Sequence, residues 1–215
     1  MAAATIAVAV LSTALAQAGV AAGSTVAALW HMDETSGTTM VDSSGHGNNG
    51  TLHSVQLGAY GCSVRGYTFN GSSSYVSVPS SASLNPGSAN ITISFCLKTT
   101  YLPKSGDYDL VRKGAYPSRD YKVELLPTGQ IQCTFRGSSS DHNATGGSGL
   151  NNGAWHRIKC VKTSSQIKLV IDGTVEETTS ATVGSISNSS ALYIGAHPGS
   201  DWYHGRLDEV SIAIG

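Results

Sequence analysis

Apolar residues alternate with polar ones in many short stretches of this chain, and this period of two most restricts its fold. Residues 210–214 carry three branched apolar side chains that alternate with Ser211 and Ala213. Successive side chains of a strand point to opposite faces of a sheet, so the pattern predicts a strand with one buried face. Residues 91–97 alternate similarly, and Asp172-Gly173 is a strong hairpin signal. Residues 137–153 are rich in Gly, Ser and Asn and nearly lack apolar side chains, which predicts a long exposed loop. Roughly ten such alternating stretches and no convincing helix predict a single all-β domain, a sandwich or jelly roll.

The amino-terminal segment, residues 1–23, has no charged side chain and is dominated by Ala and Val. An apolar stretch followed by small residues predicts a secretory signal peptide with an A-x-A-type cleavage site. A membrane anchor is the alternative, but Gly and Gln interrupt the run. No other long apolar segment follows. We therefore expect a secreted domain over residues 24–215 that does not insert into a membrane.

The charge balance restricts the possible partners. Thirteen basic and fourteen acidic residues give a net charge of −1. This balance offers no electrostatic basis for binding nucleic acid or an anionic membrane surface. Only 13% of the residues are charged, and Ser, Thr, Gly and Asn are abundant. Such a composition suits polar loops that meet neutral sugars, so we expect a polysaccharide or glycan as partner.

Four cysteines in an exported chain predict disulfides, for which three connectivities are possible. None lies in a C-x-x-C pair, which disfavours a thiolate zinc site. We predict a Cys133–Cys160 bridge because each residue lies mid-strand, in strands able to neighbour one another across a sheet. We also predict Cys62–Cys96, because Cys62 lies just before a strand and is able to reach Cys96.

An acidic pair accompanies each end of the predicted domain. Asp33-Glu34 follows the first apolar run, and Asp208-Glu209 comes just before the last one. This arrangement suggests that the first and last strands lie side by side. One carboxylate from each pair is then able to share Ca²⁺, which takes six to eight oxygen ligands. The alternative is two solvated turns.

Seven segments occur in an order that resembles a known family. They are LWHMDETSGTTMVDSSGHGNNGTL (29–52), YTFNGSSSYVSVP (67–79), ITISFCLKT (91–99), GAWHRIKCVKT (153–163), IKLVIDG (167–173), LYIGA (192–196) and GRLDEVSI (205–212). Together they resemble the laminin G-like jelly-roll domains of the concanavalin A-like lectin and glucanase superfamily. The resemblance implies a two-sheet antiparallel jelly-roll sandwich. It implies less about function, because lectins, binding modules, hydrolases and lyases share this fold.

The resemblance also implies a structural Ca²⁺ near the place where the first and last strands meet. Matched residue by residue, Asp33 and Asp208 would supply side-chain oxygens, and the Asn70-Gly71 turn would supply a backbone carbonyl. Many relatives have acids after the position of Gly71. Here residues 72–74 are serines, which removes ligand charge.

Catalysis on this fold needs particular sets of residues. Laminarinase-type glucanases present Glu-x-Asp-x-Glu on one strand, but Glu124 and Glu176-Glu177 have no partner at that spacing. Jelly-roll polysaccharide lyases use Tyr and His with Arg or Lys, which neutralises a uronate carboxylate while the C5 proton is removed. The lyase candidates here are His156, Tyr121, Arg112 and Lys113, and their arrangement matches no lyase motif. If the protein is an enzyme, we expect a secreted lyase rather than a hydrolase.

Aromatic residues in two loops favour carbohydrate binding over catalysis. Rings cover the apolar face of a pyranose, and Asp, Asn and Arg bond its hydroxyls. The candidates are Tyr116, Arg119, Asp201, Trp202, Tyr203 and His204. We expect one of Trp202 and Tyr203 to close the end of the sandwich, and we favour Trp202 as the exposed one. An extracellular adhesion module with a protein ligand is a further alternative.

Overall fold

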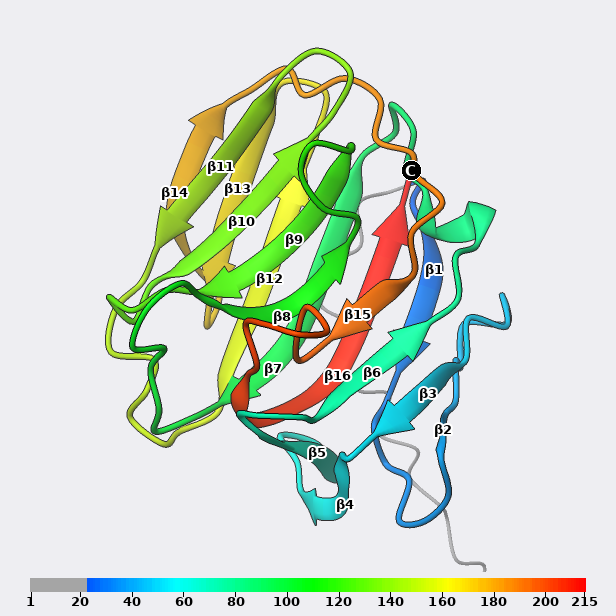
Figure 1. Cartoon of the computed structure of the whole chain (residues 1–215). Helices are drawn as coiled ribbons and strands as arrows, with labels where there is room; N and C mark the ends of the chain where they lie inside the picture. The colour runs from blue at the N-terminus through cyan, green and yellow to red at the C-terminus, as the bar shows by residue number, and fades with distance from the viewer. Residues whose placement is uncertain (1–22) are drawn as a thin grey trace, which may run out of the picture.

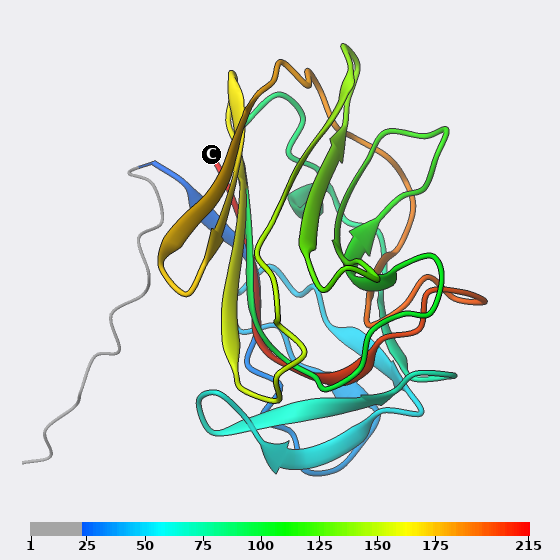
Figure 2. The ribbon, with the colours of Figure 1, turned by 90° about the vertical axis from the view of Figure 1, so that its left-hand side faces the viewer.

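The computed structural model describes residues 23–215 and places them in two antiparallel sheets packed face to face (Figures 1 and 2). The first sheet holds β14 (Thr174–Ser180), β13 (Gln166–Ile171), β12 (His156–Lys162), β7 (Ile91–Lys98), β16 (His204–Ile214), β5 (Arg65–Asn70) and β4 (Gln56–Tyr60), with β1 (Thr25–Trp30) also paired to β16. The second sheet runs in the order β11 (Asp141–Gly146), β10 (Ile131–Arg136), β9 (Asp120–Leu125), β8 (Tyr108–Lys113), β15 (Leu192–Ile194), β6 (Tyr75–Val78), β3 (Gly50–His53) and β2 (Thr39–Met40). The predicted two-sheet antiparallel jelly-roll sandwich is confirmed. Apart from Gly23, the predicted signal peptide lies outside the described residues.

The first and last strands lie side by side, as the acidic pairs suggest. β1 pairs antiparallel with the second half of β16, where Thr25 is opposite Ile214 and Trp30 is opposite Val210. The first half of β16 pairs with β5, and its other edge pairs with β7. The carboxyl-terminal strand is therefore an interior strand of the first sheet, paired with β7, β5 and β1 (Figure 1).

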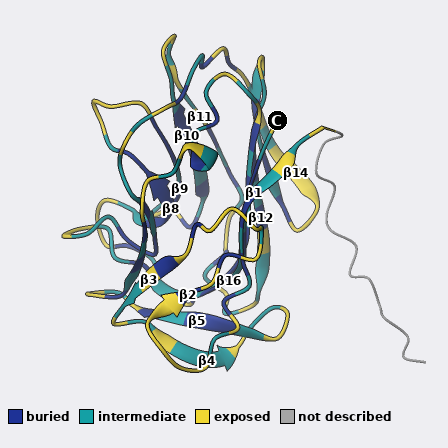
Figure 3. Ribbon diagram, turned by 90° about the vertical axis from the view of Figure 1, so that its right-hand side faces the viewer, coloured by how far each residue is buried: buried dark blue, intermediate teal, exposed yellow. Residues whose placement is uncertain are grey.

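The core lies between the two sheets, and the period-two pattern accounts for it. On β7, four apolar side chains at alternate positions, Ile91, Ile93, Phe95 and Leu97, are buried. Figure 3 shows the buried residues concentrated in the strands and the exposed ones in the connecting loops. Trp30 is fully buried, and its indole N–H donates to the Asn48 carbonyl at 2.8 Å. The polar atom of this large side chain is therefore satisfied inside the core.

Both predicted disulfides are present. Cys62, in the β4–β5 turn, is bridged to Cys96 on β7, with a Cα–Cα distance of 6.4 Å. Cys133 on β10 is bridged to Cys160 on β12, with a Cα–Cα distance of 5.8 Å. The expected reason for the second bridge is wrong, because β10 and β12 belong to different sheets. Cys133–Cys160 crosses the core and ties the two sheets together.

One predicted loop contains a strand. The Gly-, Ser- and Asn-rich residues 137–153 are expected to form a long exposed loop, but β11 lies within them and pairs along β10 from Asp141–Arg136 to Gly146–Ile131. Tertiary pairing overrides the weak strand propensity of these residues, because β10 presents a free edge that needs backbone partners. Among the described residues, no helix is long and apolar enough to cross a membrane.

Candidate functional site

Four half-buried rings, which we call the aromatic strip, lie on the outer face of the second sheet and beside it. They are His53, Tyr75, Tyr193 and Trp202. Val76 and Val78 of β6 point into the core, so Tyr75 points outward. His53 is directly opposite Tyr75, and the two rings stack with centroids 4.1 Å apart. The strip therefore leaves part of its ring surface accessible on the outside of the sheet.

Trp202 and Tyr203 are neighbours with opposite environments. Trp202 is half-buried, and its ring lies 5.8 Å from that of Tyr75. Tyr203 is fully buried, and its hydroxyl lies 2.9 Å from the Lys98 carbonyl and 3.2 Å from the Arg206 carbonyl. Tyr203 therefore closes the core and cannot contact a sugar, which corrects its inclusion among the sugar-binding candidates. Trp202 is the ring that remains accessible.

A pocket of about 190 Å³ opens next to Trp202, where three loops meet. The β5–β6 turn, the β7–β8 loop and the β15–β16 loop supply its walls. The wall residues include Gly71, Lys104, Asp107, Tyr108, Asp201 and Trp202. The pocket thus combines two rings with two carboxylates and one amine.

Paired charges continue along the same outer face, on β8, β9 and β10. Arg112 Nη1 lies 2.6 Å from Asp109 Oδ2, Lys122 pairs with Glu124, and Arg136 binds both oxygens of Asp120, at 2.8 and 3.0 Å. Burial raises the pKa of Asp109 and of Asp120, while the neighbouring guanidinium of each opposes this rise. These pairs give the sheet a fixed polar surface next to the pocket.

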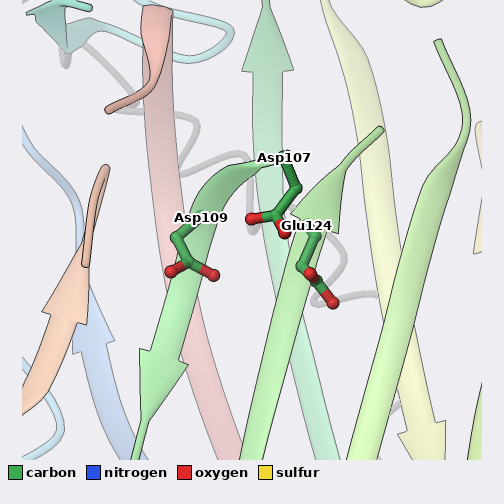
Figure 4. Close-up of side chains that lie close together, drawn as sticks. All are labelled: Asp107, Asp109 and Glu124. Carbon is green, nitrogen blue, oxygen red and sulfur yellow. The ribbon is translucent and has the colours of Figure 1, made fainter. Parts of the chain in front are cut away.

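Asp107 carries the most perturbed carboxyl of the pocket. Burial, with a further contribution from the adjacent Glu124 carboxylate, raises the pKa of Asp107 to about 7. Asp109 and Glu124 are opposite each other on β8 and β9, and one carboxylate oxygen from each of the three acids lies within 4.8 Å of the other two (Figure 4). Glu124 has no acidic partner at the Glu-x-Asp-x-Glu spacing of one strand, but Asp109 on the neighbouring strand and Asp107 just before that strand lie close to it. The Asp-x-Asp spacing at 107–109 is visible in the sequence, but only the strand register shows that Glu124 lies beside these two acids.

The remaining sugar-binding candidates divide between two places. Asp201 lines the pocket, and His204 stacks on the ring of Tyr101 with centroids 3.5 Å apart, adjoining Gly71. Tyr116 and Arg119 are exposed but lie in the turn after β8, whereas the pocket adjoins the beginning of that strand. The six residues do not form one site, because β8 separates the two groups by about 17 Å.

The lyase candidates are also dispersed. Arg112 lies on the outer face of the second sheet, paired with Asp109. The Lys113 ammonium donates to the Asn188 and Ser190 carbonyls in a buried position, and the buried Tyr121 hydroxyl donates to the Leu84 carbonyl. His156 lies on β12 in the other sheet, where Nδ1 contacts Asp172 at 2.8 Å. Since these groups face different surroundings, the structure does not bring the predicted set together.

The predicted calcium ligands lie in two separate positions. Asp208 Oδ2 accepts the Cys62 and Ser63 amides at 2.8 and 3.0 Å, and Asp33 Oδ1 accepts the Arg65 amide at 2.8 Å, so both acids hold the β4–β5 turn. Burial, opposed by these amides, raises the pKa of Asp208 to about 6. Asn70 pairs with His204, and His204 lies four residues before Asp208 on β16. Asn70 is therefore about 13 Å from Asp208 along the strand direction. The structure does not bring Asn70 and Gly71 to the two acids.

A second hollow, of about 210 Å³, lies on the outer face of the first sheet. Its polar walls include Arg157, Lys159 and Glu209, and its single aromatic residue, Phe95, is buried in the core. This hollow is slightly larger than the pocket beside Trp202, but it offers no accessible ring. Sugar recognition by stacking therefore favours the pocket beside Trp202.

Sequence comparison now decides the family. A laminin G family model, described as the concanavalin A-like lectin/glucanases superfamily, matches residues 70–213. The chain belongs to the concanavalin A-like lectin/glucanases superfamily. No curated protein matches the chain by sequence.

Solved structures of this superfamily's fold superpose on most of the chain. The binding domain of Paraclostridial Mosquitocidal Protein 1 has a TM-score of 0.73 and 18% identity, covering 87% of this chain and 48% of its own. The receptor-binding domain of botulinum neurotoxin C/D mosaic serotype has a TM-score of 0.69 and 13% identity, covering 87% and 47%. Domain 4 of AbnA, a GH43 extracellular arabinanase from Geobacillus stearothermophilus solved with arabinotriose, has a TM-score of 0.68 and 17% identity, covering 89% and 93%. The chain spans about half the length of the toxin domains, and at these identities the likeness shows the fold alone.

Proposed function

We propose that this protein is an exported carbohydrate-binding domain that holds a glycan over the aromatic strip, with one sugar residue in the adjoining pocket. The observation that carries the proposal is the position of Trp202. Its half-buried ring packs beside Tyr75 and forms part of the wall of a pocket that also presents Asp107 and Asp201. Ring surface next to hydrogen-bonding carboxylates is the combination that recognises a pyranose or furanose.

The size of the pocket limits what enters it. At about 190 Å³ it is smaller than the roughly 300–1,000 Å³ of pockets that enclose drug-sized ligands. It therefore accepts a single sugar residue, and the rest of a longer glycan crosses the aromatic strip. Asp107 and Asp201 would accept hydrogen bonds from sugar hydroxyls there, and Lys104 would donate one.

Two further observations support the proposal. One similar domain, domain 4 of the extracellular arabinanase AbnA, was solved with arabinotriose, and the chain covers 93% of it. The two disulfides persist best in an oxidising compartment, which agrees with export.

The proposal is tested by titrating the purified protein with neutral oligosaccharides, including arabinotriose, and by isothermal calorimetry on each one that binds. We expect binding without turnover, so the oligosaccharide is recovered intact by chromatography. Failure to bind any member of a broad glycan array would overturn the proposal. Cleavage to unsaturated products, detected by ultraviolet absorbance, would show instead that the protein is a lyase.

A further inference from the structure

The group of acids beside the pocket has a second use that does not depend on glycan binding. We propose that Asp107, Asp109 and Glu124 bind a divalent cation, with Ca²⁺ as the preferred ion. This place differs from the Asp33–Asp208 region indicated by the sequence.

The geometry suits a single ion. Asp109 and Glu124 are cross-strand neighbours, and Asp107 precedes β8 by one residue. One carboxylate oxygen of each acid lies within 4.8 Å of the others (Figure 4). Ca²⁺ binds oxygens at about 2.3–2.6 Å, so two ligands on opposite sides of the ion are separated by about 4.6–5.2 Å. The three oxygens are therefore close enough to share one ion.

Unmet hydrogen-bonding capacity is the second observation. Asp109 is 0% exposed, and its Oδ1 atom has no hydrogen-bond partner among the described residues. The Oδ1 atom of Asp107 is also buried without a partner there. A buried carboxylate oxygen without a partner is costly, because it has lost its water and gained nothing in exchange. A cation bound through these two oxygens would satisfy both of them.

The local charge balance points the same way. Three carboxylates stand against two cationic side chains, those of Arg112 and Lys122. Each cation pairs with one carboxylate oxygen of the group, Asp109 Oδ2 for Arg112 and Glu124 Oε1 for Lys122. Asp109 Oδ1, which has no partner among the described residues, therefore remains for a metal, and Glu124 Oε2 accepts a hydrogen bond from the Thr134 hydroxyl at 3.2 Å. Two nearby positive charges weaken the site, so we expect a Kd of about 10⁻⁴–10⁻³ M, as in other extracellular modules.

The chemistry of the ligands selects the ion. All three are carboxylates, and neither Cys nor His belongs to the group, which disfavours zinc and copper. Asp107 is half-buried and lines the pocket, so water is able to complete the coordination from that side. Ca²⁺ tolerates such an irregular and partly hydrated shell better than Mg²⁺, which demands a near-ideal octahedron.

The test uses the whole protein, freed of metal with a chelator and titrated with CaCl₂ alone in the absence of glycan. At a calcium concentration ten times the Kd, we expect the Tm to rise by about 3–6 °C and calorimetry to show one site per chain. Asp107→Asn is the main variant, because it keeps the side-chain shape and alters a carboxyl group that forms no salt bridge with another residue the structure describes. It should fold, melt at or above the temperature of the metal-free wild type, and lose the calcium response.

The matched control is Asp33→Asn, which alters the place indicated by the sequence and should keep the full response. Asp109→Asn should also lose the response, and a circular dichroism spectrum like that of the wild type would show that it has folded. The proposal is overturned if millimolar CaCl₂ leaves the Tm of the wild type unchanged. It is equally overturned if Asp107→Asn keeps the response or if Asp33→Asn abolishes it.

Discussion

Two adjacent residues, Trp202 and Tyr203, have different roles, the first proposed for glycan binding and the second for stability of the core. Trp202 faces the pocket, and Tyr203 is fully buried beneath it. We predict that Trp202→Ala weakens glycan binding at least tenfold, since ring stacking on a sugar is lost, while the Tm changes little. Isothermal calorimetry measures the affinity, and a thermal melt measures the stability.

Tyr203→Phe is the matched variant for this experiment. It removes the hydroxyl that contacts the Lys98 and Arg206 carbonyls, so the free energy of unfolding should fall by about 1–3 kcal/mol. Glycan affinity should stay within twofold of the wild type, because the ring and its packing remain. A Tyr203→Phe protein of normal stability but weakened affinity would contradict the assignment of Tyr203 to the core.

The buried Lys113 side chain should make the free energy of unfolding depend on pH. Burial lowers the pKa of Lys113 from 10.5 to about 8. Between these two values the unfolded chain binds more protons than the folded one, so this residue makes the free energy of unfolding rise with pH across that window. We predict that Lys113→Met flattens the rise, as measured by urea unfolding at several pH values from 8 to 10.5. An unchanged slope would show that Lys113 keeps an ordinary pKa.

At the scale of secondary-structure elements, the Cys133–Cys160 bridge joins β10 of one sheet to β12 of the other. It closes a loop with a sequence separation of 27 residues. We predict that the double substitution of Cys133 and Cys160 by Ala lowers the free energy of unfolding by about 3–4 kcal/mol, because the unfolded chain gains freedom. Denaturant unfolding measures this loss. Glycan affinity should persist below the melting transition, since neither cysteine lines the pocket.

The whole molecule is close to neutral, with a net charge of −1. The charges next to the pocket are largely paired within the protein. Binding of a neutral glycan should therefore depend little on ionic strength. We predict that raising NaCl from about 0.05 to 0.5 M changes the Kd less than twofold, because screening acts mainly on net charge interactions. A much steeper dependence would indicate an anionic glycan held by Lys104 and its neighbours.

The prediction of the fold succeeded where the information is local. Alternation in residues 91–97 and 210–214 identifies strands and their buried faces, because the side-chain period of a strand is two. It failed for residues 141–146, whose small polar side chains form β11 only because β10 offers an edge. The disulfide pairing was predicted, but its position between the sheets was not, since nothing in the sequence says which strands share a sheet.

The candidate site was harder to predict from the sequence than the fold, because it depends more on tertiary structure. The sequence pointed to Asp201 and Trp202, because aromatic and acidic residues in a loop favour sugar binding. It could not distinguish Trp202 from Tyr203 with certainty, and it did not find Tyr75 or His53, which meet only through the pairing of β3 with β6. It also grouped Tyr116 with residues at the other end of β8.

By itself, the sequence determined that this chain is an all-β sandwich or jelly roll, because the alternation that marks each strand is a local pattern. The acidic pairs only suggested that the first and last strands are in contact, and the family resemblance supplied the two-sheet arrangement. Only the tertiary structure decided which side chains face one another. Register places Asp109 opposite Glu124 and His53 opposite Tyr75, although more than ten residues separate each pair along the chain. Contacts between strands depend on pairing partners and on a shift of a single residue, and neither is encoded in the composition of one strand.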